Sequence, residues 1–198
     1  MTQPSLELTP KRAEIADAAL RIIETRGIAA LTTAALAAEL GVSSGAPFRH
    51  FASREEILEA VVVRVEGLIL ATFPPETTPP LERIQALLRA RVKVVGGHRG
   101  IGRLMFSEQF ALALPEAAVA RLRSVVVRTQ AFLLNALAEG QREGAVRGDL
   151  TAEALLSVVF GLLMHLVYTQ AASHGRRAGD IGETCTTLLA ILQPPSAR

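Results

Sequence analysis

The residues best suited to chemistry lie between Gly41 and Arg54, in the stretch GVSSGAPFRHFASR. This stretch holds Arg49, Arg54 and the titratable His50, and it contains no acidic residue. A guanidinium group can bind guanine O6 and N7 through two parallel hydrogen bonds, and it can also bind a phosphate. The pattern therefore favours contact with a nucleic acid, made by a small local patch of positive charge.

The same inspection gives catalysis little support. The histidines are scattered along the chain, at His50, His98, His165 and His174. No HExxH motif occurs, and Cys185 is the single cysteine, so neither zinc-ligand spacing nor a Cys–His pair is visible. The glycine-rich segment 96–102 lacks GxGxxG spacing and a P-loop lysine, and it is predicted to be a flexible break between helices. We expect no enzyme activity, no metal site and no cofactor.

Composition limits the class of protein further. The chain of 198 residues is 49% hydrophobic, with mean hydropathy +0.32, and can bury a substantial core. Its formal charge is +2, but the first 73 residues carry seven Lys/Arg against nine Asp/Glu. A single cysteine excludes an internal disulfide framework and is consistent with a reducing cytoplasm. The beginning MTQPSLELTPKR does not resemble a secretory signal, so a cytoplasmic location is expected.

The longest apolar run, Ala154–Tyr168, is the one candidate for a membrane span. It covers 15 residues, short of the roughly 20 that a bilayer requires, and contains polar side chains. A core helix buried on several sides is therefore predicted. Small or polar residues recur every four positions at Ser157, Gly161, His165 and Thr169, and this stripe would let the helix pack against a symmetry mate.

Helix signals follow one another along the N-terminal part of the chain. Thr9 is a predicted N-cap, and Thr32 is predicted to cap a second helix that stops at Gly41. Ser43 can cap a third, very short helix that runs to about residue 52. The S-x-x-E sequence at Ser53 forms a capping box for a fourth helix. The second and third helices, at about 32–51, form a helix-turn-helix.

The proline-rich segment FPPETTPP, at 73–80, marks a boundary between domains. Longer amphipathic patterns follow and are predicted to be helices at 81–95, 104–114, 115–140, 151–172 and 181–192. The expected fold is all-α, with about nine helices. The expected parts are an arm (1–8), a DNA-binding domain (9–73), a boundary (74–80), an effector and dimerisation domain (81–193) and a tail (194–198).

The segment LTTAALAAELGVSSGAPFRHFASREEIL resembles the TetR/AcrR family of bacterial transcriptional regulators. The resemblance covers about residues 9–70. Its pattern is GVS-x-G, an aromatic residue, a phenylalanine, then a serine and an acidic pair. One position departs from this pattern, because Phe48 stands where the family usually has a tyrosine whose hydroxyl contacts a phosphate. Phe48 therefore weakens one implied contact.

The resemblance implies a role for each residue of the patch. It places phosphate contacts at Thr32, Thr33, His50 and Arg54, with Phe48 at the aromatic contact position. Ser43 would cap the recognition helix. Base edges would be faced by Ser44, Gly45, Ala46 and Arg49. The partner implied is double-stranded DNA carrying an inverted repeat, bound by a homodimer.

The larger domain concentrates adaptable apolar side chains, which suit a ligand cavity. The expected lining is Leu104, Met105, Phe106, Phe110, Phe132, Leu133, Phe160, Met164, His165 and Tyr168. His165 and Tyr168 would supply polar contacts to a small, mostly apolar effector. Arg103 and Glu108 are the charged residues close by in sequence that could pair with a charge on the ligand.

Two functions from different classes fit these observations. The first is a ligand-responsive, sequence-specific DNA-binding repressor. The second is an architectural or chromosome-organising DNA-binding protein with a filled core and no effector. An apolar cavity in the larger domain would favour the first.

Overall fold

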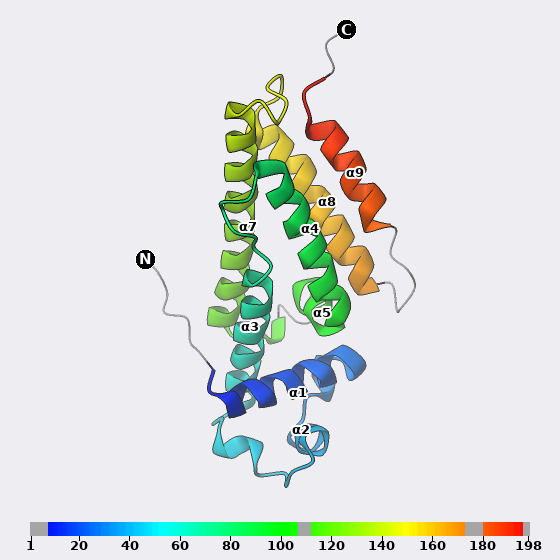
Figure 1. Ribbon diagram of the computed structural model, residues 1–198. Coiled ribbons are helices and arrows are strands. Elements are labelled where there is room, and N and C mark those ends of the chain that lie inside the picture. Colours follow the sequence, from blue (N-terminus) through cyan, green and yellow to red (C-terminus); the bar gives the residue numbers. More distant parts are fainter. Residues whose placement is uncertain (1–7, 107–111, 173–179, 196–198) are drawn as a thin grey trace. The chain divides into compact units, whose positions relative to one another are not determined.

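The computed structural model describes residues 8–106, 112–172 and 180–195 (Figure 1). Within these ranges, eight α-helices and two 3-10 helices have described bounds, and every regular element is helical. The all-α prediction is confirmed. The chain divides into two compact units. Unit 1 comprises Met1–Leu70 with His98–Ser124, and unit 2 comprises Ala71–Gly97 with Val125–Arg198.

Unit 1 is built around the first helix. Its elements are α1 (Pro10–Arg26), η1 (Ile28–Ala30), α2 (Thr33–Leu40), η2 (Pro47–Arg49), α3 (Arg54–Leu70) and α5 (Arg99–Phe106). Helix α1 lies across α3 and also packs against α2 and α5 (Figure 1). Its buried side includes Ile15, Ile22 and Ile23, each 1% exposed or less. This buried face supports the helix-turn-helix that follows.

The predicted caps of α1 and α2 are confirmed. The Thr9 hydroxyl accepts a hydrogen bond from the Arg12 N–H at 3.4 Å, and the Thr32 hydroxyl accepts one from the Ala35 N–H at 3.2 Å. Each cap satisfies a backbone donor that a helix start leaves unpaired. Gly41 ends α2 in the left-handed region, at φ 67°, where a side chain is disfavoured.

The third predicted helix is only a 3-10 turn, η2, preceded by a turn. The Ala46 N–H donates to the Ser43 carbonyl at 2.9 Å, and the His50 N–H donates to the Pro47 carbonyl at 3.1 Å. Pro47 has no N–H, so it cannot make the α-helical bond back to Ser43. The expected cap by the Ser43 side chain is absent from the described hydrogen bonds, and the short i→i−3 pattern replaces an α-helix.

The capping box of α3 is present in a modified form. The Glu56 N–H donates to the Ser53 hydroxyl at 3.2 Å, while the Glu56 carboxylate accepts from the Ala52 N–H at 3.0 Å. The reciprocal bond therefore reaches one residue further back than in the usual box. It fixes the connection between η2 and α3.

Unit 2 consists of α4 (Pro80–Gly97), the later part of α7 (Glu116–Arg142), α8 (Ala152–Ala172) and α9 (Ile181–Leu192). Helix α4 packs against both α8 and α9. The Arg147 N–H donates to the Leu192 carbonyl at 2.7 Å and ties the connection after α7 to the end of α9.

The glycine-rich segment 96–102 contains the predicted break between helices, but the break is a single residue, His98. Helix α4 ends at Gly97 and α5 begins at Arg99, so most of the segment is helical. A Cβ placed on Gly100 would lie 2.7 Å from the Leu20 Cδ1 atom. Glycine at this position therefore permits close packing of α5 on α1. The chain passes between the two units after Leu70, after Gly97 and after Ser124, and the first of these points lies shortly before the proline-rich segment at 73–80.

Helix α8 is longer than the apolar run that predicted it. In length and composition, Ala152–Ala171 could cross a membrane, and a third of this span is buried within the chain. Leu155, Val159 and Leu163 are each 1% exposed or less, on a helix that packs against α4. Helix α8 is a partly buried core helix, as predicted.

Candidate nucleic-acid interface

Residues 41–50, here called the reading segment, connect α2 to the start of α3. Pro47 is buried and anchors the segment to unit 1. The predicted contact residues around it are accessible: Ser43, Ser44, Gly45, Phe48, Arg49 and His50 are exposed, and Ala46 is half-buried. The segment therefore presents a short, narrow backbone with small side chains in its first half. Such a shape can approach a DNA groove closely.

The charges of unit 1 explain how an acidic stretch of sequence can still attract DNA. Three carboxylates are paired with arginines: Glu39 with Arg21 at 2.8 Å, Asp17 with Arg64 at 2.7 Å, and Glu66 with Arg121 at 2.9 Å. In the ranges that the structure describes, the Arg49 side chain has no hydrogen-bond or ion-pair partner, and neither has the His50 side chain. Arg49 is thus an exposed positive charge without a paired carboxylate on the reading segment.

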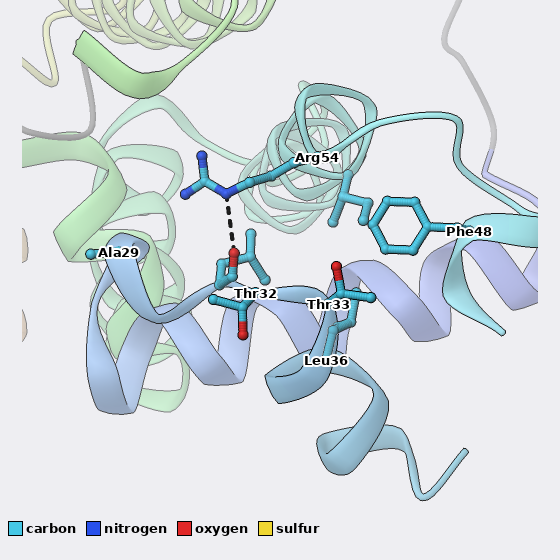
Figure 2. Close-up of a pocket in the computed structure, with 8 residues that line it drawn as sticks. Ala29, Thr32, Thr33, Leu36, Phe48 and Arg54 are labelled. Atoms are coloured by element: carbon cyan, nitrogen blue, oxygen red, sulfur yellow. Dashed lines mark hydrogen bonds between the residues drawn. The ribbon is translucent and has the colours of Figure 1, made fainter. Parts of the chain in front are cut away.

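Four of the predicted DNA-contact residues gather around one small cavity of about 270 Å³. Its lining consists of Ala29, Leu31, Thr32, Thr33, Leu36, Phe48, Arg54 and Ile57. Figure 2 shows the Phe48 ring on one side of this pocket and the Arg54 side chain extending along another. The structure therefore places Thr32, Thr33, Phe48 and Arg54 together at the N-terminus of α2. The other predicted contacts lie on the adjoining reading segment.

Arg54 makes contacts that the sequence did not predict. Its Nε donates to the Leu31 carbonyl at 3.1 Å, and its Nη2 donates to the Ile28 carbonyl at 2.9 Å. The side chain is half-buried. These two bonds, of which Figure 2 draws the one to Leu31, join the start of α3 to the turn that leads into α2. Arg54 is therefore committed to internal contacts, while Arg49 is free to reach outward.

The two phenylalanines of the motif have different surroundings. Phe51 is 1% exposed, and the Arg12 guanidinium lies 4.4 Å from the centre of its ring. Phe51 therefore belongs to the core of unit 1. Phe48 is 37% exposed and lines the pocket. Lacking a hydroxyl, Phe48 can offer only an apolar surface to a DNA backbone.

The predicted effector residues are divided between the two units. In unit 1, Leu104 is buried, Met105 half-buried and Phe106 39% exposed. In unit 2, Leu133 is fully buried, and Phe132, Phe160 and Met164 are half-buried. Phe110 lies outside the described residues. Half-buried apolar side chains on unit 2 suit a ligand surface better than Leu133, which is already packed.

His165 and Tyr168 do not face the interior of unit 2. Both are exposed, and Tyr168 is 56% exposed. They share the exposed face of α8 with Val158 and Gly161, because positions three and four residues apart lie on one side of a helix. Both were predicted to supply polar contacts inside a cavity. Their exposure in a single chain does not agree with that prediction.

Two buried arginines of α4 were missed by sequence reasoning. Arg83 and Arg91 are 4% and 2% exposed. The signal was available, because Arg83, Leu87, Arg91 and Val95 are spaced by four residues and share the inward face of α4. The apolar spacing of α4 therefore places two charged side chains inward as well.

Comparison with known proteins decides the family. Residues 15–61, which include α2 and the reading segment, match the model of the "Bacterial regulatory proteins, tetR family". Residues 15–61 belong to the TetR family. The matched residues cover the helix-turn-helix of unit 1, in a family of bacterial regulatory proteins.

Relatives of this TetR-family protein extend the comparison. Nucleoid occlusion factor SlmA of Idiomarina loihiensis is 35% identical over 98 residues, 48% of this chain and 50% of that protein. The chain thus spans about half the length of that curated relative. KstR2 of Mycobacterium tuberculosis, a ketosteroid transcriptional regulator, has a similar structure with a TM-score of 0.67 at 20% identity. The alignment covers 96% of this chain and 98% of KstR2.

A further structure contains both a small molecule and DNA. AibR in complex with isovaleryl coenzyme A and operator DNA aligns with a TM-score of 0.72 at 16% identity, over 93% of this chain and 99% of AibR. At these identities, KstR2 and AibR establish the common fold.

Proposed function

We propose that the protein is a homodimeric, cytoplasmic repressor that leaves its operator when a small molecule binds. The observation that carries this proposal is the reading segment. It is exposed, has no acidic residue, and holds Arg49 outward between two capped helices. Fixed position and unpaired charge are what direct recognition of base edges requires.

The reading segment and α2 would divide the DNA contacts between them. Arg49 would bind a guanine in the major groove, with Ser44, Gly45 and Ala46 close to neighbouring bases. Thr32, Thr33 and His50 would contact phosphates, because a helix N-terminus presents N–H groups and positive potential to an anion. We assign Arg54 a positioning role in place of the predicted phosphate contact, since two carbonyls already bind its guanidinium.

The exposed face of α8 supports the proposed homodimer. An apolar helix that is only one-third buried leaves much surface to cover. At Gly161 a Cβ would meet no atom of the described residues within 4 Å, so nothing in that part of the chain requires glycine there. Close approach of a second copy would explain the small residue, and a twofold dimer would bind an inverted repeat.

Control by an effector is supported by the fold and by two relatives. KstR2 is described as a transcriptional repressor, and AibR has been captured with both an acyl-CoA and operator DNA. In this chain, the half-buried Phe132, Phe160 and Met164 offer adaptable apolar surface in unit 2. We therefore keep 9–73 as the proposed DNA-binding domain and 81–193 as the proposed effector and dimerisation domain.

A second function is favoured by one observation, the 35% identity to a nucleoid occlusion factor. A chromosome-organising protein would bind DNA through the same reading segment but would need no effector. The two functions differ in what releases the protein from DNA.

Selection of binding sites from random DNA by the purified protein tests the proposal. We expect an enriched inverted repeat, bound by two copies of the chain. The selected duplex is then challenged with cell extract fractionated by size. Release by a fraction of low molecular mass supports the repressor, whereas DNA binding that no such fraction changes supports the chromosome-organising alternative. Failure to enrich any sequence contradicts sequence-specific regulation.

A further inference from the structure

Arg91 is a positive charge buried in unit 2 without a described counter-charge. It lies on the inward face of α4 and is 2% exposed. Its Nε donates to the Thr72 hydroxyl at 3.0 Å, and its Nη2 donates to the Thr129 hydroxyl at 3.5 Å. In the ranges that the structure describes, no Asp or Glu forms an ion pair with it. Neutral hydroxyls therefore provide its hydrogen bonds.

The burial of this guanidinium is costly. Desolvation lowers the pKa of Arg91 to about 10, so the group remains protonated at neutral pH. A buried charge without an opposite charge reduces the stability of a fold unless something else compensates it. A methionine could fill a similar volume without this cost. An arginine at such a position therefore points to a role other than stability.

Arg83 on the same helix shows what compensation looks like. It is 4% exposed, and its guanidinium forms an ion pair with Glu139 of α7. Two arginines on one face of α4, eight residues apart, thus differ in their partners. Arg83 has a carboxylate supplied by the chain, whereas the described residues offer Arg91 two hydroxyls and an aromatic ring.

The surroundings of Arg91 are arranged to hold it in one orientation. The Thr129 hydroxyl donates to the Val125 carbonyl at 2.8 Å, so its oxygen is left to accept from Arg91. The guanidinium lies 5.5 Å from the centre of the Phe73 ring, and Phe73 meets Phe132 edge to face at 5.0 Å. Both rings are half-buried, so the cluster extends toward accessible surface. Of the five N–H donors of a guanidinium, two have described acceptors here.

We propose that Arg91 binds the carboxylate of a small organic acid whose apolar body lies against Phe73 and Phe132. This inference rests on the proposed function as an effector-responsive regulator and names the chemical class of its effector. A single buried cation matches a single negative charge, and a guanidinium fork fits the two oxygens of a carboxylate. Bound acid would supply the counter-charge that Glu139 supplies to Arg83. The sequence-based expectation of a mostly apolar effector is thereby sharpened to an amphipathic acid.

The test compares acids with uncharged analogues of the same shape. The purified full-length protein is titrated calorimetrically with decanoate, decanamide, 4-phenylbutyrate, 4-phenylbutyramide and decyl phosphate. We expect at least one carboxylate to bind at least about tenfold more tightly than its amide, as befits a charged hydrogen bond. It should also bind more tightly than the dianionic phosphate. Equal affinity for acid and amide, or no binding of any of these probes, overturns the proposal.

Two variants separate ligand binding from structural support. Arg91→Met should bind acid and amide equally, and without ligand it should melt at or above the wild-type temperature. Arg83→Met, the matched control, should melt at a lower temperature because it leaves Glu139 unpaired. A preference for the acid that survives in Arg91→Met, or a melting temperature that falls as far as in Arg83→Met, contradicts the proposal.

Operator binding is measured on the same preparations. If the wild type binds its selected DNA but none of the carboxylates, the acid site is refuted and the regulator function stands. If a carboxylate binds through Arg91 and no sequence-specific DNA binding is found, the site stands and the proposed function fails.

Discussion

Uncompensated positive charge occurs in both units, but in opposite surroundings. Arg49 is exposed on the reading segment, where water solvates it and keeping it unpaired costs little. Arg91 is buried in unit 2, where the same charge is expensive. The difference indicates two kinds of partner. A solvated charge suits a polyanion whose binding weakens with salt, and a desolvated charge suits one small anion that enters and excludes water.

The largest expected effect comes from a charge placed on the exposed face of α8. Gly161→Glu should weaken dimerisation by about 4 kcal/mol or more, because a twofold axis buries the new carboxylate twice. Sedimentation velocity at micromolar concentration should show a monomer with the helix content of the wild type. Gly67→Glu is the control, because Gly67 is an exposed glycine within α3 at which a Cβ also meets no atom within 4 Å. A Gly161→Glu dimer as tight as the wild type would show that this face is not the interface.

The two arginines of α4 give the next largest effect. Arg83→Met should lower the free energy of unfolding by about 3 kcal/mol, because it leaves the Glu139 carboxylate, 32% exposed, without its partner. Arg91→Met should lower it by less than about 1 kcal/mol or raise it, since a costly charge is removed. Urea unfolding of both variants and of the wild type measures these changes in the free energy of unfolding. Equal losses would mean that the two buried charges are equivalent and that Arg91 has a structural role.

Removal of the Arg54 side chain should have an intermediate effect on stability, because this side chain is half-buried and its acceptors are neutral carbonyls. Arg54→Ala should cost about 2 kcal/mol of stability through the loss of two charged hydrogen bonds. Binding to selected and scrambled DNA should weaken together, with the salt dependence unchanged. If stability is unchanged and the slope of log affinity against log salt falls by about one, Arg54 contacts a phosphate after all.

Local signals made the helix-turn-helix predictable. The caps at Thr9, Thr32 and Ser53 and the stop at Gly41 act within four residues of their partners, so the sequence shows both ends of each bond. Pro47 was visible too, but its consequence was underestimated. It turned a predicted α-helix into a 3-10 turn by removing one donor.

What the sequence could not show depends on contacts between distant segments. The need for glycine at Gly100 arises from Leu20, 80 positions earlier in the chain. The bonds of Arg54 reach carbonyls 23 and 26 residues away. Helix α7 supplies the Glu139 carboxylate that pairs with Arg83. Toward Arg91, the same helix presents the Thr129 hydroxyl. Periodicity indicated which face of α4 is buried, but not which charges on that face would find partners.

The smallest effect concerns Arg49, and it bears on the central claim that the reading segment recognises DNA sequence. Removal of one bidentate base contact should cost about 1–3 kcal/mol of binding without changing the fold. The variant Arg49→Ala retains the caps and the internal bonds of Arg54, so the rest of the interface stays in place. Ser44→Ala serves as the control, because it alters an exposed neighbour and leaves the charge.

The most direct measurement is the affinity of wild-type and Arg49→Ala protein for two duplexes, the selected inverted repeat and a scrambled version of it. Fluorescence anisotropy at several salt concentrations gives both affinity and salt dependence. We predict that Arg49→Ala loses about 10- to 100-fold in affinity for the selected site and much less for the scrambled duplex. Equal losses on both duplexes, or no loss on either, would contradict recognition of sequence by the reading segment.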